Sequence, residues 1–170
     1  MSRHGATVTR SAHRDEPRGQ ALVEFALVIP IFLLLLFGII EGGRFVFFYE
    51  MLSNATREGA RYAIVHGSNS ACPSGPLPGD LVNTCDPLGR NVKNAVRDAA
   101  VSLVDTGDLF VSEPQWCVAG SSPPKRGYVC EGTNARGNYV TVFVDYSYSP
   151  VIPVLPSITI SVESTLVINN

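Results

Sequence analysis

The chain has 170 residues, of which 45% are hydrophobic, and a formal net charge of −2. This length accommodates one compact domain with an appendage and excludes two full-sized domains. The slightly negative charge gives nucleic-acid binding no electrostatic support, so we expect no nucleic-acid partner.

An apolar segment at residues 21–40 follows a basic N-terminal segment. It holds one charged residue, Glu24, and is long enough to cross a bilayer as a helix. Arginines exceed acidic residues in the preceding segment (Arg3, Arg10, Arg14 and Arg18 against Asp15 and Glu16). Positive charge beside a first span keeps that side cytoplasmic. We therefore predict a single-pass protein of the cell membrane with a cytoplasmic N-terminus and an extracytoplasmic C-terminal domain.

The apolar segment differs from a secretory signal peptide in its length and in the residues directly after it. Signal peptides have an apolar core of about 7–15 residues and a small-x-small cleavage site, whereas this run is longer and leads into "EGGRFVFFYEML". We therefore expect the segment to stay attached. A helical period continues beyond it, with one stripe at Phe45, Phe48, Leu52, Ala55, Gly59 and Ala63. The pattern predicts one helix from about residue 20 to about residue 66.

All four cysteines lie after the apolar segment, in stretches rich in glycine, proline and serine. Four cysteines permit three connectivities. The equal separations favour two local disulfides, Cys72–Cys85 and Cys117–Cys130, in an oxidising compartment. Zinc is the competing interpretation, but no C-x-x-C occurs and the three histidines are dispersed. We predict disulfides and no metal site.

The remaining segments predict short elements. Asp86 and Pro87 are typical of a helix N-cap and first turn, and the helix is expected to end near Gly107. Residues 108–112 and the segment around Trp116 are expected to form short strands. Alternation over residues 140–148 predicts a longer strand, and a last strand comes after the prolines beyond it. We predict an α+β fold, in which a long N-terminal transmembrane helix extends into a head with a short helix and a small antiparallel sheet.

No catalytic motif emerges from the sequence. It contains no G-x-S-x-G, no H-E-x-x-H and no P-loop. His66 is the one histidine after the apolar segment, so a histidine-dependent site in the head would have to use it. We predict that the protein is not an enzyme and has no cofactor.

Three motifs carry a family resemblance. "GQALVEF", residues 19–25, resembles the processing motif of Flp-type pilins. "NATREGARYAIVHG", residues 54–67, looks like the motif found after the span in TadE-like proteins, the minor pseudopilins of the tight-adherence pilus machinery. "YVTVFVDYSYSPVIP", residues 139–153, is similar to the ending of that family.

The resemblance implies a division of the chain. Residues 1–19 would be a basic cytoplasmic leader, residues 20–42 the transmembrane part of the helix, and residues 43–170 an extracytoplasmic TadE-like, pilin-like domain. A membrane-embedded aspartic prepilin peptidase would cut between Gly19 and Gln20. Glu24 and Phe25 would complete the processing motif. Partners implied are the lipid bilayer, the prepilin peptidase and other Tad/Flp pilus assembly subunits.

Individual residues in these motifs have competing interpretations. After cleavage, Glu24 could pair with the new α-amino group of Gln20 in its own chain or a neighbour's; alternatively it snorkels to the membrane edge. Pro30 removes one helical hydrogen bond and is either a point of bending or a tolerated membrane proline. Arg57, Glu58 and Arg61 are candidates for contact with a partner helix, although Glu58 and Arg61 also fit a simple surface pair.

The first functional hypothesis is a membrane-anchored minor pseudopilin that takes part in assembling a tight-adherence pilus for surface adhesion. The alternative is a permanently anchored single-pass envelope protein whose ectodomain binds a ligand or scaffolds secretion. The two differ in whether the leader is removed.

Overall fold

A computed structural model describes residues 18–100, 107–122, 124, 126–127, 129–152 and 155–169. The chain divides into two compact units, Met1–Ile39 and Ile40–Asn170, and each is described by itself. Most of the expected leader lies outside the described residues. The division at residues 19 and 42 therefore stays a prediction.

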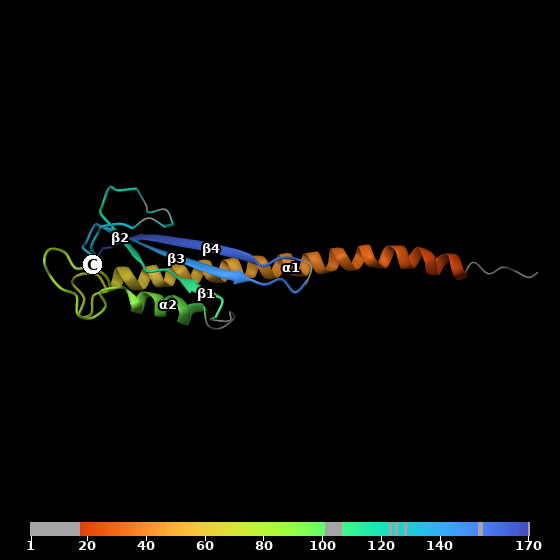
Figure 1. Ribbon diagram of the computed structural model, residues 1–170, viewed down its shortest axis with the longest axis horizontal. Coiled ribbons are helices and arrows are strands. Elements are labelled where there is room, and N and C mark those ends of the chain that lie inside the picture. Colours follow the sequence, from red (N-terminus) through yellow and green to blue (C-terminus); the bar gives the residue numbers. More distant parts are fainter. Residues whose placement is uncertain are drawn as a thin grey trace, which may run out of the picture. The chain divides into compact units, whose positions relative to one another are not determined.

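The first unit is described by the N-terminal part of one helix, α1, which spans Arg18–Val65 (Figure 1). Its large apolar side chains are exposed: Leu34 is 71% exposed and Ile39 is 74% exposed. Pro30 lies inside the helix, which continues on both sides of it. Among the described residues, α1 is the one helix long and apolar enough to cross a membrane. Its exposed apolar surface is what a lipid-facing helix requires.

In the second unit, the C-terminal half of α1 buries one face. Leu52, Ala55 and Ala63 of the predicted stripe are at most 1% exposed, whereas Phe45 remains 36% exposed. The buried face is wider than predicted, because Thr56 and Ala60 are also fully buried. The Thr56 hydroxyl donates to the Leu52 carbonyl at 2.6 Å, so its burial leaves no unpaired hydroxyl donor.

The second helix, α2, spans Arg90–Ala100, so it begins later than predicted. Gly89 has a φ of 66°, a left-handed conformation that stops the helix from extending back towards Pro87. Asp86 nevertheless caps the helix, because its carboxylate accepts from the backbone N–H groups of Arg90 at 2.6 Å and Asn91 at 3.1 Å. The expected end near Gly107 adjoins residues outside the described part.

The sheet has four described strands, with β3 at its centre (Figure 1). β3 (Tyr139–Tyr148) pairs antiparallel with β4 (Ile158–Val167) along its full length. On the other edge of β3, β1 (Leu109–Val111) and β2 (Gln115–Cys117) pair antiparallel with its two ends. This arrangement confirms the predicted α+β fold with a small antiparallel sheet.

Both faces of β3 are covered, although the alternation predicts only one covered face. Val140, Val142 and Val144 are fully buried on the predicted face. Phe143, on the opposite face, is only 3% exposed, and the guanidinium of Arg126 lies 5.4 Å from its ring centroid. Arg126 also forms an ion pair with Asp145. The segment after β2 therefore covers the outer face of the sheet.

The cysteines form two local disulfides in the structure. Cys72 and Cys85 have a Cα–Cα distance of 5.5 Å, and Cys117 and Cys130 one of 5.0 Å. In the first loop, the Asn83 amide donates to two backbone carbonyls, and its oxygen accepts from the backbone N–H groups of Cys85 and Asp86. These bonds position Asp86 to cap α2.

Candidate functional site

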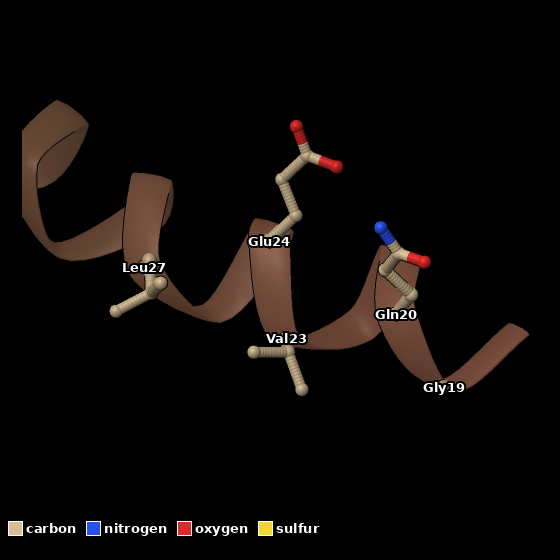
Figure 2. Close-up of a pocket in the computed structure, with 5 residues that line it drawn as sticks. All are labelled: Gly19, Gln20, Val23, Glu24 and Leu27. Carbon is tan, nitrogen blue, oxygen red and sulfur yellow. The ribbon is translucent and has the colours of Figure 1, made fainter. Parts of the chain in front are cut away.

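The residues of the expected processing motif lie in the first two turns of α1. Gly19, Gln20, Glu24 and Phe25 are all exposed, Phe25 at 63%. Figure 2 shows the side chains of Gln20 and Glu24 directed to the same side of the helix, away from Val23. Residues four apart in a helix share a face. The Glu24 carboxylate therefore lies on the same face of α1 as the Gln20 side chain, one turn further along the helix.

The bond expected to be cut joins Gly19 and Gln20 inside the first helical turn. The N–H groups of a first turn have no partner within the helix, so this turn opens easily. A Cβ added at Gly19 would meet no described atom within 4 Å. Glycine also loses helical order more readily than other residues. The local structure is therefore suited to being drawn out into an extended strand in a protease cleft.

An open hollow lies along this turn, lined by Gly19, Gln20, Val23, Glu24 and Leu27 (Figure 2). One helix face forms all of its described wall. A single face cannot enclose a small ligand, because ligand sites bury most of the ligand surface. The hollow is therefore better suited to a contact with another helix or protein than to a bound small molecule.

The second candidate set lies far along α1, in the head. Arg57, Glu58 and Arg61 are exposed. Glu58 and Arg61 form an ion pair at 3.6 Å between the carboxylate and guanidinium, with side chains 53% and 70% exposed. An exposed pair of this kind contributes little to stability. The three side chains are accessible to a partner, and their contact with a partner helix stays a prediction.

A polar cluster that the sequence analysis did not identify lies just after the apolar segment. The carboxylate of Glu41, with a side chain only 12% exposed, accepts from the Tyr148 hydroxyl and, at 3.3 Å, from the Val151 N–H. It also lies 3.5 Å from the Arg44 guanidinium. The available signal was a carboxylate directly after the apolar run, but its two hydrogen-bond donors, Tyr148 and Val151, lie more than 100 positions away in the sequence.

Two aromatic rings complete this cluster. The guanidinium carbon of Arg44 lies 5.7 Å from the ring centroid of Tyr148 and 5.9 Å from that of Phe48. Burial, and then the hydrogen bond to Glu41, raise the pKa of Tyr148 from 10.0 to about 12, although Arg44 opposes the shift. Tyr148 is therefore a neutral hydrogen-bond donor to the carboxylate at physiological pH.

Residues 19–61 match the family model for TadE-like protein. The resemblance drawn from the sequence is thereby confirmed for this TadE-like segment, which contains the expected processing motif and Arg57, Glu58 and Arg61. Residues 62–170, with α2 and the sheet, lie beyond the match. Searches among curated proteins and solved structures give no significant match.

The TadE-like segment includes the apolar part of α1, which is long and apolar enough to cross a membrane. A single long apolar helix in the described part of the chain supports anchoring by one pass. In that part, no three histidine, cysteine, aspartate or glutamate side chains gather as metal ligands would.

Proposed function

We propose that the protein is a membrane-anchored minor pseudopilin that takes part in assembling a tight-adherence pilus for surface adhesion. Its role is structural rather than enzymatic. The observation that carries the proposal is the position of the processing motif. Gly19, Gln20, Glu24 and Phe25 lie at the exposed start of the apolar helix, inside the segment that matches the TadE-like family model.

The proposed maturation begins at the cytoplasmic face. The leader, residues 1–19, carries the excess of arginine, so it stays in the cytoplasm while the head lies outside. An aspartic prepilin peptidase in the membrane draws out the first turn of α1 and cuts between Gly19 and Gln20. Gly19 is required because its bare backbone fits an extended conformation in a narrow cleft.

The mature chain then has a positive α-amino group at Gln20 and a carboxylate one turn away at Glu24. An α-amino group has a typical pKa near 8 and is largely protonated at neutral pH. In the proposal, the carboxylate pairs with this group in its own chain or in a neighbouring subunit. The pair lies at the membrane edge, where weaker screening strengthens it relative to bulk water.

The length of α1 supports an assembly role. The helix has 48 residues, which at 1.5 Å per residue is roughly 70 Å and well over twice what a bilayer core requires. Its later half carries the exposed Arg57, Glu58 and Arg61, which can contact a neighbouring subunit while the opposite face packs on the sheet. A helix that serves only as a membrane anchor does not need this amphipathic C-terminal half.

N-terminal sequencing of the protein extracted from membranes of its native host tests the proposal. A mature chain that begins at Gln20 is expected. An intact leader in cells that make the prepilin peptidase would contradict it and favour a permanently anchored envelope protein. Deletion of the peptidase is the matched control, because it should leave the leader in place without changing the amount of protein in the membrane.

A further inference from the structure

The connection between β3 and β4 exposes apolar side chains. Val151 is 67% exposed and Leu155 is 47% exposed, and Ile158 at the start of β4 is 46% exposed. The sequence from residue 149 to residue 162 contains no charged residue. Exposed loops of soluble domains are usually polar, so an uncharged loop with exposed apolar side chains indicates an interaction surface.

The structure fixes where this loop begins. The Val151 N–H donates to the Glu41 carboxylate at 3.3 Å, and Tyr148, the last residue of β3, donates to the same carboxylate. Glu41 comes directly after the apolar residues 21–40 in the sequence. Where α1 crosses a bilayer, the start of the loop therefore lies at the level at which the helix leaves it.

Two charged side chains at this level, Glu41 and Arg44, are paired with each other. Glu41 has a side chain only 12% exposed and lies 3.5 Å from Arg44. On α1 just beyond this pair, Phe47 is 50% exposed and Tyr49 is 46% exposed. Aromatic side chains are enriched where a membrane meets water, and paired charges cost less there than free ones. The surroundings of the loop thus match a membrane interface.

We propose that the described residues 149–152 and 155–157 of this connection, here called the membrane-proximal loop, lie in the headgroup region of the bilayer that α1 crosses, with Val151 and Leu155 among the inserted side chains. A bilayer is the occupant that the position favours, because the loop starts at Glu41, the residue that follows the apolar segment in the sequence. The proposal rests on anchoring by α1 and is independent of leader removal and of pilus assembly. Lipid contact at a second point fixes the head against the membrane surface.

Site-specific fluorescence in the full chain tests this inference. The described cysteines are disulfide-bonded, so a single added cysteine accepts a thiol-reactive NBD label. Val151→Cys and Leu155→Cys report on the loop. Ile39→Cys, in the apolar segment and 74% exposed, is the positive control, and Val82→Cys, 81% exposed, is the negative control.

The negative control lies near the far end of α1. Val82 belongs to the Cys72–Cys85 loop, in which the Ser74 N–H donates to the His66 carbonyl. At 1.5 Å per helical residue, Val65, the last residue of α1 and the neighbour of His66, is roughly 36 Å along the helix from Glu41. Each variant is reconstituted at one protein per nanodisc of phosphatidylcholine and phosphatidylglycerol, so that a second copy cannot shield the label.

Labels at positions 151 and 155 are expected to emit at shorter wavelength than the label at position 82. Interfacial segments lie about 5–10 Å into the boundary between headgroups and acyl chains, so lipid nitroxides near that boundary should quench both labels roughly threefold more than position 82. Quenching at position 39 alone would overturn the loop proposal while leaving anchoring intact. A blue shift without lipid quenching would also overturn it, because protein would then cover the loop. No quenching at position 39 would overturn both anchoring and the proposal.

Discussion

The hydroxyl of Tyr148 in β3 donates a hydrogen bond to the carboxylate of Glu41 in α1, 107 residues earlier in the chain. The Tyr148 side chain is 2% exposed, and its ring makes edge contacts with Phe45 and Phe48 at centroid distances of 5.8 and 5.4 Å. This contact joins the end of the central strand to the helix at the point where the apolar run ends. It therefore holds the end of β3 beside Glu41, the residue that follows the apolar run in the sequence.

Removing the hydroxyl should destabilise the head. Tyr148→Phe keeps the ring and leaves the Glu41 carboxylate with one donor fewer. Because hydrogen bonds to charged groups contribute about 1.5–3 kcal/mol, we expect a loss of that size in the free energy of unfolding. Denaturant unfolding of the full chain in detergent measures it, and Tyr49→Phe, at an exposed position on α1, is the matched control. Equal stability of the two variants would contradict the role of the bond.

The same pair predicts a dependence on alkaline pH. The pKa of Tyr148 is raised to about 12 in the folded chain from 10.0, by burial first and by Glu41 second. A raised folded-state pKa contributes stability that is fully present below the unfolded-state pKa and is lost as the pH rises through the folded-state value. The stability difference between wild type and Tyr148→Phe should therefore narrow between pH 10 and pH 12. A constant difference over that range would argue against the shift.

The contact between α1 and α2 depends on a glycine. A Cβ at Gly59 would lie 2.2 Å from Cγ2 of Val96, which is fully buried. Valine has one strongly preferred rotamer in a helix, so it cannot turn away, and Gly59→Ala should cost about 1–3 kcal/mol of unfolding free energy. Gly42→Ala, where a Cβ meets no described atom within 4 Å, should be neutral or slightly stabilising. In a Val96→Ala background the cost at Gly59 should largely disappear; persistence would assign it to another contact.

Gly19 should be the residue that the peptidase needs most. Nothing described within 4 Å would oppose a larger side chain there, so Gly19→Leu should leave folding of the head unchanged. The protease cleft, rather than the fold, should reject it, and the precursor should remain uncut. Mass spectrometry of the membrane-extracted chain, co-expressed with its peptidase, measures the fraction that begins at Gln20. Normal maturation of Gly19→Leu would show that the proposed cut site is wrong.

Glu24→Gln separates the pairing role of the carboxylate from its role in insertion. The substitution keeps the size and hydrogen-bonding capacity of the side chain but removes the charge. Membrane level and leader removal should be close to wild type, whereas surface piliation should fail because the pair with the α-amino group at Gln20 is lost. Normal piliation would defeat the pairing mechanism and favour a snorkelling glutamate. An uncut precursor would move the role of Glu24 to the peptidase step.

Features that depend on local pattern could be predicted from the amino-acid sequence alone. The apolar run at residues 21–40 predicts a membrane-spanning helix from its length and composition alone, and these residues lie in α1. The stripe through Leu52 and Ala55 predicts the buried face, because helical period is a local property. The motifs at residues 19–25 and 54–67 led to the resemblance to TadE-like proteins, and the family model for TadE-like protein matches residues 19–61.

Contacts between residues far apart in the sequence could not be predicted without the folded structure. In the sequence, Glu41 is simply a charged residue after an apolar run. In the structure it is largely buried because Tyr148, at the end of β3, and Val151, in the loop after β3, both donate hydrogen bonds to its carboxylate. Likewise, the alternation along β3 predicts that Phe143 lies on a solvent-exposed face. In the structure Phe143 is buried, and Arg126 lies over its ring. Because Gly89 has a left-handed backbone conformation, α2 begins at Arg90, after the first turn that the sequence predicted. Such contacts depend on how helices and strands pack against one another, and the hydrophobic periodicity of a single segment carries no information about that packing.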